Sequence, residues 1–552
     1  MTSFSTDMPL LRTALLAAVP AVYVLAALAA GLFRQTPGTG WRLARWSATL
    51  AGTAALLSLG WLLAAGGGLA RGPELFTLGN AGALHLSLRS DALGCTMLLL
   101  VSFIAWVIVG YSQPYLDGEG GQPRYVRGLM LTLAAVSLLV LTNNLLVLAV
   151  AWIVTSLALH VLLTFFDQRP QALIAAHKKF LASRVADLCL LGGFALLGGT
   201  LGTLEIDRAI AVVQGLQQTP AALQAAALLM ATSALLKCAQ LPVHGWLIQV
   251  MEAPTPVSAL LHAGVVNLGG FLLIRLGVLV ADVPQAQALL VIVGSVTAVV
   301  AALVMTTRVS IKVALAWSTC AQMGFMLMEC GLGLHDLALL HLVAHSLYKA
   351  HAFLGAGGAV EQNRLQQMTR PMPPLGLAAW LMGAALGGVL VGAAALLWGV
   401  RPTQAPALWA MAGIFAMALA RPLAGQLVLG RGAWRWGGLL AAFAVALAYF
   451  GLHLLSSRWL GVQAVGAPPS LVVVAWVLGC FGLLFAVQAA VRAFPQGALA
   501  RGLYPWLFAG LYLDELFTRL TFRVWPARKP ASSAHPASSV AAPLASRPTG
   551  AL

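Results

Sequence analysis

Charged side chains are scarce in this sequence: Asp, Glu, Lys and Arg make up only 9% of its 552 residues. An average soluble domain is about one quarter charged. The shortage excludes a soluble enzyme, a coiled coil and a disordered protein, because each needs a far more polar surface. Hydrophobic residues reach 60% instead, and at about 20 residues for each span they suffice for well over a dozen membrane helices. The composition therefore predicts an all-α polytopic membrane protein.

Cysteine is sparse as well. The six cysteines stand singly in or beside apolar runs and form no C-x-x-C pair, so neither a disulfide framework nor a cysteine metal site is indicated. The sequence also lacks a Gly-rich dinucleotide motif, a phosphate-binding loop and a haem or cluster ligand set. We therefore expect no catalytic residues, no metal and no cofactor in this chain, and we do not expect an enzyme.

Acidic residues number 16 against 32 Lys and Arg, but the basic residues are scattered between apolar runs rather than gathered in a patch. This pattern favours control of membrane topology over nucleic-acid binding, and no nucleic-acid partner is expected. Apolar runs and their punctuation predict about fifteen spans. They begin near residues 9, 44, 91, 127, 145, 181, 222, 255, 286, 312, 336, 372, 406, 436 and 470.

The predicted loops differ in charge. Loops after odd-numbered spans hold fourteen positive charges and loops after even-numbered spans hold five. Positive charge marks the cytoplasmic side, so we expect an inner-membrane protein with its N-terminus outside and its C-terminus in the cytoplasm. Asp7 precedes the first apolar run without a basic region or cleavage site, which predicts that the first helix is retained.

The C-terminal region differs from the spans before it. Residues 503–525 mix aromatic and charged side chains at helical spacing, which predicts an amphipathic segment at the membrane surface or against a partner. Residues 530–552 are rich in Ala, Ser and Pro and are expected to be disordered. We divide the chain into N-terminal helices (1–110), a central core (111–425), C-terminal helices (426–495), a surface segment (496–529) and that tail.

Ionisable residues within the apolar runs are the candidate functional residues, because a charge at membrane depth costs at least about 2.5 kcal/mol. Lys237 stands five residues before Pro242 in K-C-A-Q-L-P-V-H-G-W-L. Proline removes a backbone donor and opens the helix, so Lys237 is expected beside freed carbonyl groups and water at a helix break. This setting favours a proton carrier over a lysine that extends to the membrane interface.

His341, His345 and Lys349 follow one another at intervals of four residues in H-L-V-A-H-S-L-Y-K-A-H. This spacing aligns three titratable groups on one helix face over about 12 Å, which favours a water-linked proton relay. Inert packing and a metal site are the alternatives, but a third metal ligand is not evident. His351 lies off this face and is expected to be structural.

The remaining candidates are more evenly balanced. Arg184 and Asp187 share a helix face, as part of the proton path or as an interfacial salt bridge. Glu329 stands near the end of an apolar run, as a buried proton site or an interfacial carboxylate. His262 lies inside a span, and alone it is typical of a packed core histidine. His160 is a weaker candidate of the same kind, and Lys312 is expected to mark a span boundary. Segments 177–262 and 312–349 each carry Lys and His within apolar helices, which is consistent with an inverted repeat.

Five stretches between about Tyr111 and Gly358 resemble the antiporter-like subunits of respiratory complex I and of multi-subunit cation/proton antiporters, of the subunit 5 or NuoL type. These stretches are S-R-V-A-D (183–187), K-C-A-Q-L-P-V-H-G-W-L (237–247), A-P-T-P-V-S-A-L-L-H-A (253–263), A-L-A-W-S-T-C-A-Q-M-G (314–324) and H-L-V-A-H-S-L-Y-K-A (341–350). The resemblance implies two inverted five-helix repeats with a discontinuous helix in each. By motif it makes Lys237 the lysine of the first broken helix, His262 the histidine of the next helix, and His341, His345 and Lys349 the central relay.

Two departures from this family stand out. The family has a glutamate after the tryptophan of its fifth helix, where this chain reads Trp152-Ile153. The family also carries a charged residue on its second broken helix, but residues 371–400 hold no ionisable side chain and no lysine occurs between Lys349 and Lys529. The second half-channel therefore cannot work in the standard way, and the family's long lateral C-terminal helix is expected to be absent.

These departures, together with H-K-K-F-L-A-S-R (177–184) and H-A-G-V-V-N-L-G-G-F (262–271), are similar to the DabB family, the membrane subunits of a two-component inorganic carbon pump. That resemblance implies a DabA-like zinc protein as partner, with zinc only in the partner, and a chain that conducts protons or sodium through the lipid bilayer to drive CO2 hydration. A proton-pumping subunit of a respiratory quinone oxidoreductase or of a cation/proton antiporter is the alternative. A structural anchor with inert titratable residues is the third hypothesis.

Overall fold

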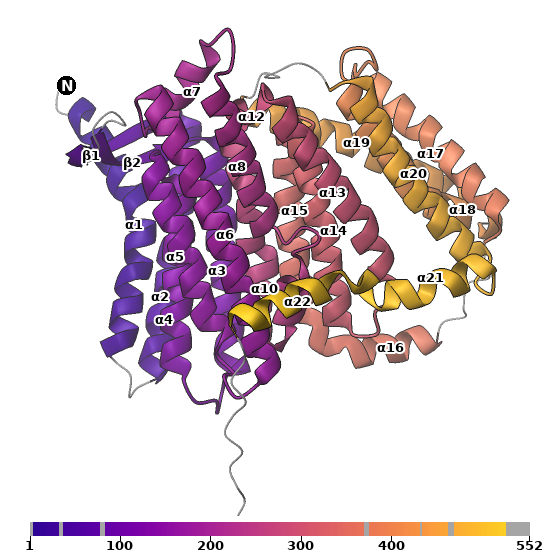
Figure 1. The fold of residues 1–552 in the computed structure, drawn as a ribbon, viewed down its shortest axis with the longest axis horizontal. Helices are drawn as coiled ribbons and strands as arrows, with labels where there is room; N and C mark the ends of the chain where they lie inside the picture. The colour runs from indigo at the N-terminus through magenta and orange to yellow at the C-terminus, as the bar shows by residue number, and fades with distance from the viewer. Residues whose placement is uncertain are drawn as a thin grey trace, which may run out of the picture.

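The computed structural model describes residues 4–32, 37–77, 83–368, 375–430, 433–461 and 469–525. Helices dominate these residues, and thirteen of the helices described are long and apolar enough to cross a membrane. Figure 1 shows them standing side by side as one bundle, with a second group of helices leaning away from it. The tail at 530–552 and the loop or terminal charges Arg34, Arg370, Arg431 and Arg528 lie outside the described residues.

Twelve of these helices are continuous. They are α1 (Phe4–Leu32), α2 (Pro37–Ala65), α3 (Ala92–Tyr115), α4 (Gln122–Leu141), α5 (Leu145–Leu163), α6 (Pro170–Leu201), α13 (Pro284–Met305), α14 (Ile311–Gly331), α17 (Leu377–Leu397), α18 (Pro406–Leu429), α19 (Ala433–Leu460) and α20 (Leu471–Ala493). The thirteenth is interrupted and consists of α10 (Thr255–Ala263), the 3₁₀ turn η3 (Val265–Asn267) and α11 (Leu268–Arg275).

Two further helices stand in the bundle but fall outside those thirteen. Helix α8 (Ala221–Lys237) is too short, because its backbone leaves the helix after Lys237. Helix α15 (His335–Leu354) is long enough but carries His341, His345 and Lys349. With these two, the described residues contain the fifteen spans that the sequence predicted. The polar residues that set α8 and α15 apart are the ones singled out as functional candidates.

Most spans begin within a few residues of the predicted positions, but α6 does not. It begins at Pro170, although the sequence predicted a start near 181. Pro170 is well suited to the first turn of a helix because that position needs no backbone donor. The correction places Lys178 and Lys179 inside a helix, where both side chains are buried, rather than in a loop.

A short hairpin was missed by the sequence analysis. Strands β1 (Gly68–Thr77) and β2 (Ala83–Ser90) pair antiparallel between α2 and α3. Asp91 follows β2 and caps α3, since its side chain accepts a hydrogen bond of 2.8 Å from the Gly94 amide. Arg275 at the end of α11 also pairs with the Asp91 carboxylate, and Arg89 approaches it at 2.9 Å. The hairpin is thereby joined to the helix bundle by charge.

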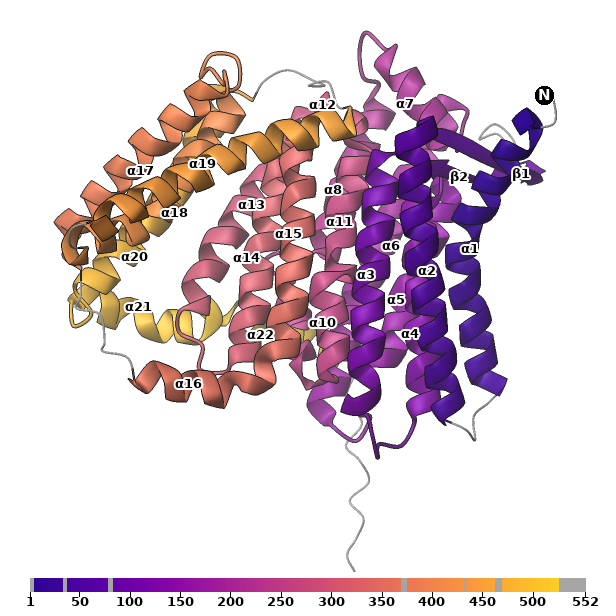
Figure 2. The ribbon, with the colours of Figure 1, turned by 180° about the vertical axis from the view of Figure 1, so that it is seen from behind.

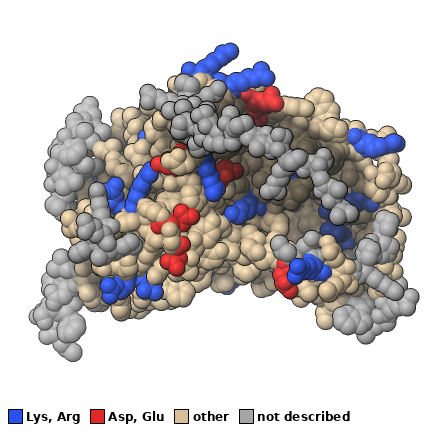
Figure 3. Space-filling model, turned by 90° about the horizontal axis from the view of Figure 1, so that it is seen from below, with Lys and Arg blue, Asp and Glu red and all other residues tan. Residues whose placement is uncertain are grey.

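The hairpin, α7 (Ile206–Gln214) and α12 (Gly277–Ala281) lie at one end of the bundle, which we call the hairpin face (Figure 1). The opposite end carries α16 (Ala359–Met368), which follows the 3₁₀ turn η4 (Gly355–Gly358), and the lateral helices α21 (Ala498–Phe508) and α22 (Leu513–Val524). We call it the lateral-helix face. Seen from below in Figure 3, it shows Lys and Arg, with some Asp and Glu, scattered between uncharged side chains.

The predicted amphipathic segment at 503–525 corresponds to α21, the 3₁₀ turn η5 (Gly510–Tyr512) and α22. These helices lie across the bundle rather than along it (Figure 1). Their partner is the chain itself: Asp514 at the start of α22 contacts Lys178 of α6, and Arg308 after α13 donates a 2.5 Å bond to the Leu507 carbonyl of α21. Two short lateral helices therefore stand where the family has a long one.

Helices α17 to α20 form the second group, which leans away from the main bundle in Figure 2. They share a hydrophobic core that includes Met411, Phe450 and Phe481, separate from the large core of the main bundle. The family pattern predicted a second discontinuous helix in this region. That expectation is wrong for α17, which is continuous from Leu377 to Leu397. It contains no proline to remove a backbone donor, so nothing in its sequence interrupts the helix.

Candidate functional site: a line of buried titratable residues

Helix α15 carries the predicted relay residues, and its neighbour α14 supplies a carboxylate. His341 Nδ1 lies 3.0 Å from Glu329 Oε2. The side chains are 11% and 5% exposed, respectively. A carboxylate buried this deeply is stable beside a group that can share a proton with it. The second ring nitrogen of His341 is buried without a hydrogen-bond partner among the described residues, so it is available to bind a proton.

One turn further along α15, the ring of His345 faces that of His341, with centroids 6.2 Å apart. His345 Nε2 lies 3.3 Å from the backbone carbonyl oxygen of His262 on α10. The His262 side chain is fully buried and stacks on Phe353 at 4.4 Å between centroids. Neither of its ring nitrogens has a hydrogen-bond partner among the described residues. Three histidines from two helices therefore lie in succession.

Lys349 ends this series toward the lateral-helix face. Its ammonium group lies 3.3 Å from the Leu315 carbonyl of α14, and the side chain is 1% exposed. No carboxylate among the described residues lies within salt-bridge distance of it. A lysine that has only a carbonyl partner at this depth can hold or release a proton according to what surrounds it.

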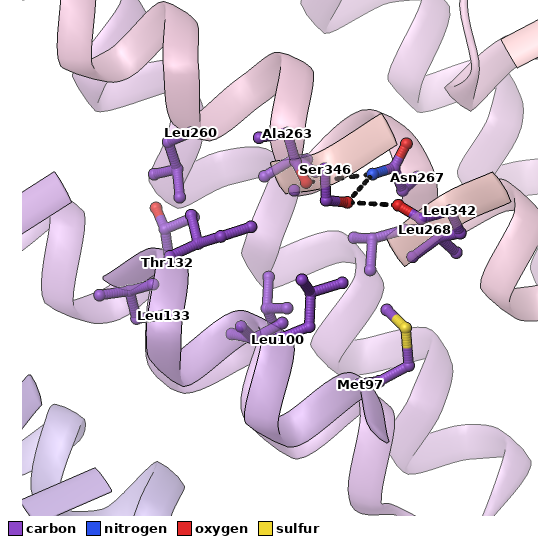
Figure 4. Close-up of a pocket in the computed structure, with 15 residues that line it drawn as sticks. Met97, Leu100, Thr132, Leu133, Leu260, Ala263, Asn267, Leu268, Leu342 and Ser346 are labelled. Atoms are coloured by element: carbon purple, nitrogen blue, oxygen red, sulfur yellow. Dashed lines mark hydrogen bonds between the residues drawn. The ribbon is translucent and has the colours of Figure 1, made fainter. Parts of the chain in front are cut away.

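The interruption between α10 and α11 is fixed to α15 by a polar contact. Asn267 donates a hydrogen bond of 2.7 Å to the Ser346 hydroxyl and another of 3.0 Å to the Ala263 carbonyl. Figure 4 shows this pair on the wall of a small cavity lined mainly by apolar side chains, with the polar side chain of Thr132 on the α4 side. Its volume of about 20 Å³ is room for a single water molecule. The break therefore offers a polar point directly beside the relay helix.

Helix α8 ends at the second lysine of the site. The Lys237 ammonium lies 3.4 Å from the Trp152 carbonyl oxygen and 4.3 Å from the centroid of the Trp152 ring. Ala239 then takes a left-handed conformation with φ of 52°, and the helix resumes only in α9 (Gly245–Gln249), followed by the 3₁₀ turn η2 (Val250–Glu252). Pro242 lies within this break, as the sequence indicated. Lys237 is buried at 4% exposure, and both the carbonyl oxygen and the aromatic face of Trp152 lie beside its ammonium group.

Arg184 and Asp187 form an ion pair on α6, with Arg184 Nη2 2.6 Å from Asp187 Oδ2. The Asp187 side chain is 4% exposed and that of Arg184 is 29% exposed, so the carboxylate lies inside the bundle while the guanidinium group reaches toward its surface. The Asp187 carboxylate is also close enough to act electrostatically on Lys237. It belongs to the same cluster as Lys237, although Ile153 replaces the glutamate that the family has there.

Lys179 is the residue that the sequence analysis missed. Its ammonium donates hydrogen bonds of 2.6 Å to the Ser156 carbonyl and 2.9 Å to the Ser156 hydroxyl, and it is 2% exposed. Ser156 lies one turn after Ile153 on α5. Arg184 pairs with Asp187, and Lys179 and Lys237 are near enough to act electrostatically on the same carboxylate, so positive charge on both lysines costs free energy through repulsion. Because Lys179 stands beside Lys178 and before the span start predicted near 181, the sequence predicts a loop charge at this position rather than a buried lysine.

Lys178 points from α6 toward the lateral-helix face. Its ammonium contacts both carboxylate oxygens of Asp514, at 3.0 and 2.8 Å. The Lys178 side chain is fully buried whereas that of Asp514 is 32% exposed. Gln249, at the end of α9, donates a further 2.9 Å bond to Asp514. One carboxylate therefore joins the lateral helix to α6 and to the segment after the α8 break.

The weaker candidates lie outside this line. His160 packs edge-to-face on Phe180, with ring centroids 5.4 Å apart. Lys312, in the first turn of α14, donates a 2.7 Å hydrogen bond to the hydroxyl of Thr255 at the start of α10. His351 is exposed. Across the ranges that the structure describes, no group of three or more His, Cys, Asp or Glu residues is placed to hold a metal ion.

The geometry describes a row of proton-accepting groups across the bundle. The Glu329 and His341 pair leads through His345 to His262 and Lys349, and a second cluster surrounds Lys237. Histidine and lysine in a dry interior exchange protons through neighbouring groups or single waters rather than with bulk solvent. The arrangement is suited to moving protons.

Comparison with known protein families agrees with this geometry. Residues 142–416 match a family described as NADH:quinone oxidoreductase/Mrp antiporter, transmembrane. Residues 76–126 match the N-terminus of chain 5 of NADH-ubiquinone oxidoreductase (complex I). The first region contains every candidate residue from Asp187 to Lys349.

Among curated proteins, the chain is similar to the probable inorganic carbon transporter subunit DabB of Hydrogenovibrio crunogenus, with 44% identity over 79% of this chain and 82% of the relative. The probable subunit DabB2 of Halothiobacillus neapolitanus is 40% identical over 81% of this chain and 82% of its own length. Subunit L of the NADH-quinone oxidoreductase of Mycobacterium tuberculosis is 38% identical over 54% of this chain and 47% of that subunit.

Solved structures show the same fold. The chain aligns with a chain of the Mrp complex from Dietzia sp. DQ12-45-1b with a TM-score of 0.63 and 26% identity, over 93% of this chain but 59% of the Mrp chain. It also aligns with a chain of an archaeal membrane-bound sulfane sulfur reductase, with a TM-score of 0.55 and 17% identity over 91% of this chain and 99% of that one. The second likeness concerns the fold alone.

Proposed function

Because this chain belongs to the DabB family of membrane subunits, within the NADH:quinone oxidoreductase/Mrp antiporter group, we propose that it conducts protons to energise inorganic carbon uptake. The chain is a membrane cation-translocating subunit, and its cargo in this proposal is the proton. The observation that carries the proposal is the line of buried titratable side chains from Glu329 to Lys237. A structural anchor has no need of so many costly groups in its interior.

The chain's own part in this function is to move charge. A proton that enters at His341 is shared with Glu329 and passes along α15 to His345 and Lys349. The lysines at 237 and 179 lie beside Asp187 and Arg184, so a change in the protonation of one alters the free energy of the other. Such coupling between buried charges can bias a conformational step in a bound partner.

The partner we propose is a DabA-like zinc protein that hydrates CO2. Zinc would lower the pKa of a bound water molecule and supply hydroxide for the hydration. Hydration of CO2 to bicarbonate releases a proton, and proton flow through the membrane chain would drive the partner in that one direction. We place this partner on the lateral-helix face, because α21 and α22 expose Trp506, Leu516 and Val524 there at 57%, 72% and 62%.

The same proposal includes an orientation in the inner membrane. The loops expected in the cytoplasm by their positive charge are those after odd-numbered spans. They include the connection that carries α16 and the segment that carries α21 and α22, whereas the hairpin and α7 follow even-numbered spans. We therefore propose that the lateral-helix face is cytoplasmic and the hairpin face is outside.

The test is growth in air of a carbonic-anhydrase-deficient bacterium that expresses this chain together with a DabA-like protein. We expect rescue that requires both chains and is lost when an uncoupler collapses the proton gradient. Lys237→Ala and His341→Ala should abolish rescue while the complex still assembles. His351→Ala is the matched control, since His351 is an exposed histidine on the relay helix. Full rescue by both relay variants would support a structural anchor instead.

The second candidate is a proton-pumping subunit of a respiratory quinone oxidoreductase or of a multi-subunit cation/proton antiporter. The similarity to subunit L favours it. Against it stand Ile153 in place of a glutamate and the absence of any ionisable side chain from α17. Failure to rescue growth, despite verified expression and assembly of both proteins, would favour this second candidate.

A further inference from the structure

A proton relay needs an opening at each side of the membrane, and α17 provides none on its own. It holds no ionisable side chain from Leu377 to Leu397. The question is how the pair of Glu329 and His341 communicates with the hairpin face. The inference that follows rests on the proposed function and concerns the outer end of the same path.

Glu329 and His341 both line a cavity of about 460 Å³ between the main bundle and the second group of helices. Its walls come from α13, α14 and α15 on one side and from α18, α19 and α20 on the other. Tyr449 of α19 lies on this wall and stacks on Phe415 at 5.0 Å between centroids. At about 30 Å³ for each water molecule, the cavity has room for a chain of waters that reaches both groups of the pair.

A second cavity of about 480 Å³ lies toward the hairpin face. It is lined by the turn between α14 and α15, by the start of α18 and by the end of α19. Asp336 and His453 stand on its wall, and His453 Nδ1 lies 2.8 Å from Asp336 Oδ2. Their side chains are 12% and 18% exposed, so both reach the cavity while remaining largely buried. His335 lines the same cavity.

Helix α19 and the pair α14 and α15 each contribute side chains to both cavities. Tyr449 and His453 are four residues apart on α19 and therefore share a helix face. Glu329 and Asp336 stand on either side of the tight turn between α14 and α15, in which the Leu334 amide donates a 2.9 Å bond to the Glu329 carbonyl. Both carboxylates are close enough to act electrostatically on Tyr449. Tyr449 thus lines the cavity of the Glu329 and His341 pair and stands on the same helix face as His453.

The charges on the cavity walls also support a proton path through these groups. Neither cavity is lined by Lys or Arg. The titratable groups on the cavity walls are the carboxylates of Glu329 and Asp336, the rings of His335, His341 and His453, and the hydroxyl of Tyr449. With no fixed positive charge beside either carboxylate, the countercharge must be a proton on the paired histidine or on the carboxyl group itself.

We propose that Asp336 and His453 form the outer mouth of the proton path, in place of a charged residue on a second broken helix. A proton from water in the outer cavity, which is the one toward the hairpin face, binds the pair of Asp336 and His453. The proton then moves past Tyr449 through water in the inner cavity, which is the one that Glu329 and His341 line, and reaches that pair. Each group returns to its starting protonation state when the proton leaves. The path from the hairpin face to the relay helix then requires nothing from α17.

The test measures proton flux in proteoliposomes that contain the full chain with any subunits that co-purify with it. A potassium diffusion potential drives the flux, and a pH-sensitive dye inside the vesicles reports it. His453→Gln and Asp336→Asn should each lower the flux by about tenfold or more, as expected for loss of a proton-transfer group. His351→Gln and Asp282→Asn are the matched controls, because both residues are exposed and neither lines either cavity.

Asp336 also has a structural contact, since Ser456 of α19 donates a 2.9 Å bond to its carbonyl. Chemical rescue separates the two roles. In His453→Gly, free imidazole added at the hairpin face should restore flux in proportion to its concentration, because the outer cavity is large enough for an imidazole molecule. A purely structural role predicts no such rescue.

The outcomes are distinguishable. A wild-type chain that conducts protons, with His453→Gln and Asp336→Asn conducting as well as it does, overturns this mouth and leaves the proposed function intact. Loss of flux in His453→Gly that imidazole does not restore also overturns it. A wild-type preparation with no proton flux overturns the proposed function and this path together.

Discussion

His341 Nδ1 and Glu329 Oε2 lie 3.0 Å apart and join the relay helix α15 to its antiparallel neighbour α14. The pair has no Lys or Arg beside it on the cavity wall. One shared proton therefore decides whether the pair is neutral or charged. In the proposed path, this pair is the entry to the row of histidines.

Glu329→Gln keeps the size of the side chain and an acceptor for His341 but removes the proton-binding carboxylate. We expect it to lower proton flux by about a hundredfold, with His341→Gln doing the same. Because the two groups share one proton, the double variant should lose no more than either single variant. Flux in proteoliposomes measures this. Effects that multiply in the double variant would show that the two residues act separately.

Lys179→Met should stop conduction without destabilising the chain. Methionine fills a similar volume, and replacing a buried charge by an apolar side chain is often neutral or stabilising. The hydroxyl and carbonyl of Ser156 then lose a donor, but the Ser156 hydroxyl can still bond within its own helix. The measurements are proton flux and the thermal unfolding midpoint in detergent.

Lys312→Met is the control for Lys179, since Lys312 bonds only the Thr255 hydroxyl at the end of its span. It should leave proton flux near the wild-type value. Normal flux in Lys179→Met would contradict a role for Lys179 in the path and return it to a packing residue.

Asp514→Asn should loosen the lateral helix α22. The substitution leaves the fully buried ammonium of Lys178 without its carboxylate, which we expect to cost about 2 kcal/mol because Asp514 itself is partly exposed. Limited proteolysis of α21 and α22 in detergent measures the loosening. Glu515→Gln is the matched control, because Glu515 is the next residue and pairs only with exposed Arg519. If α21 and α22 resist proteolysis equally in both variants, the ion pair does not hold the lateral helix in place.

The hairpin should separate from the bundle at low pH. Burial raises the pKa of the Asp91 carboxyl, but the charges of Arg275 and Arg89 outweigh it and hold that pKa below its ordinary value. A lowered folded-state pKa gives stability that is present above the unfolded value of about 3.9 and is lost as the pH falls through the folded value. Thermal unfolding of the wild type from about pH 2 to about pH 7 measures this, and the loss should appear only below about pH 3.9.

Asp91→Asn should remove that pH dependence and lower stability near neutral pH by about 3 kcal/mol, because Arg275 is then buried without its partner. Asp282→Asn, an exposed carboxylate near the same face, should keep the wild-type profile. If the stability of Asp91→Asn falls at low pH as much as that of the wild type, other carboxylates cause the pH dependence.

Much of the candidate site was accessible from local sequence. The spacing of His341, His345 and Lys349 places them on one face of any helix, and Pro242 marks the break after Lys237 in any apolar run. The number of spans followed from apolar length alone. The hairpin at β1 and β2 was missed although β2 alternates apolar and polar residues from Leu84 to Arg89, because its strands lie between two spans and a search for long apolar runs passes over them.

The burial of Lys178 and Lys179 was not accessible in this way. Both stand near predicted loop charges, and only the early start of α6 at Pro170 places them inside the bundle. The partner of Lys178 is 336 residues away in the sequence. Nothing local to either residue reveals that contact.

The sequence by itself determined that this is a membrane bundle with titratable groups on particular helix faces, because composition and helical periodicity act within one segment. Only the tertiary structure decided which of these groups meet. Asp336 and His453, or Lys178 and Asp514, come together because helices distant in the chain pack side by side. Such contacts depend on the packing of whole surfaces, and no short stretch of sequence encodes them.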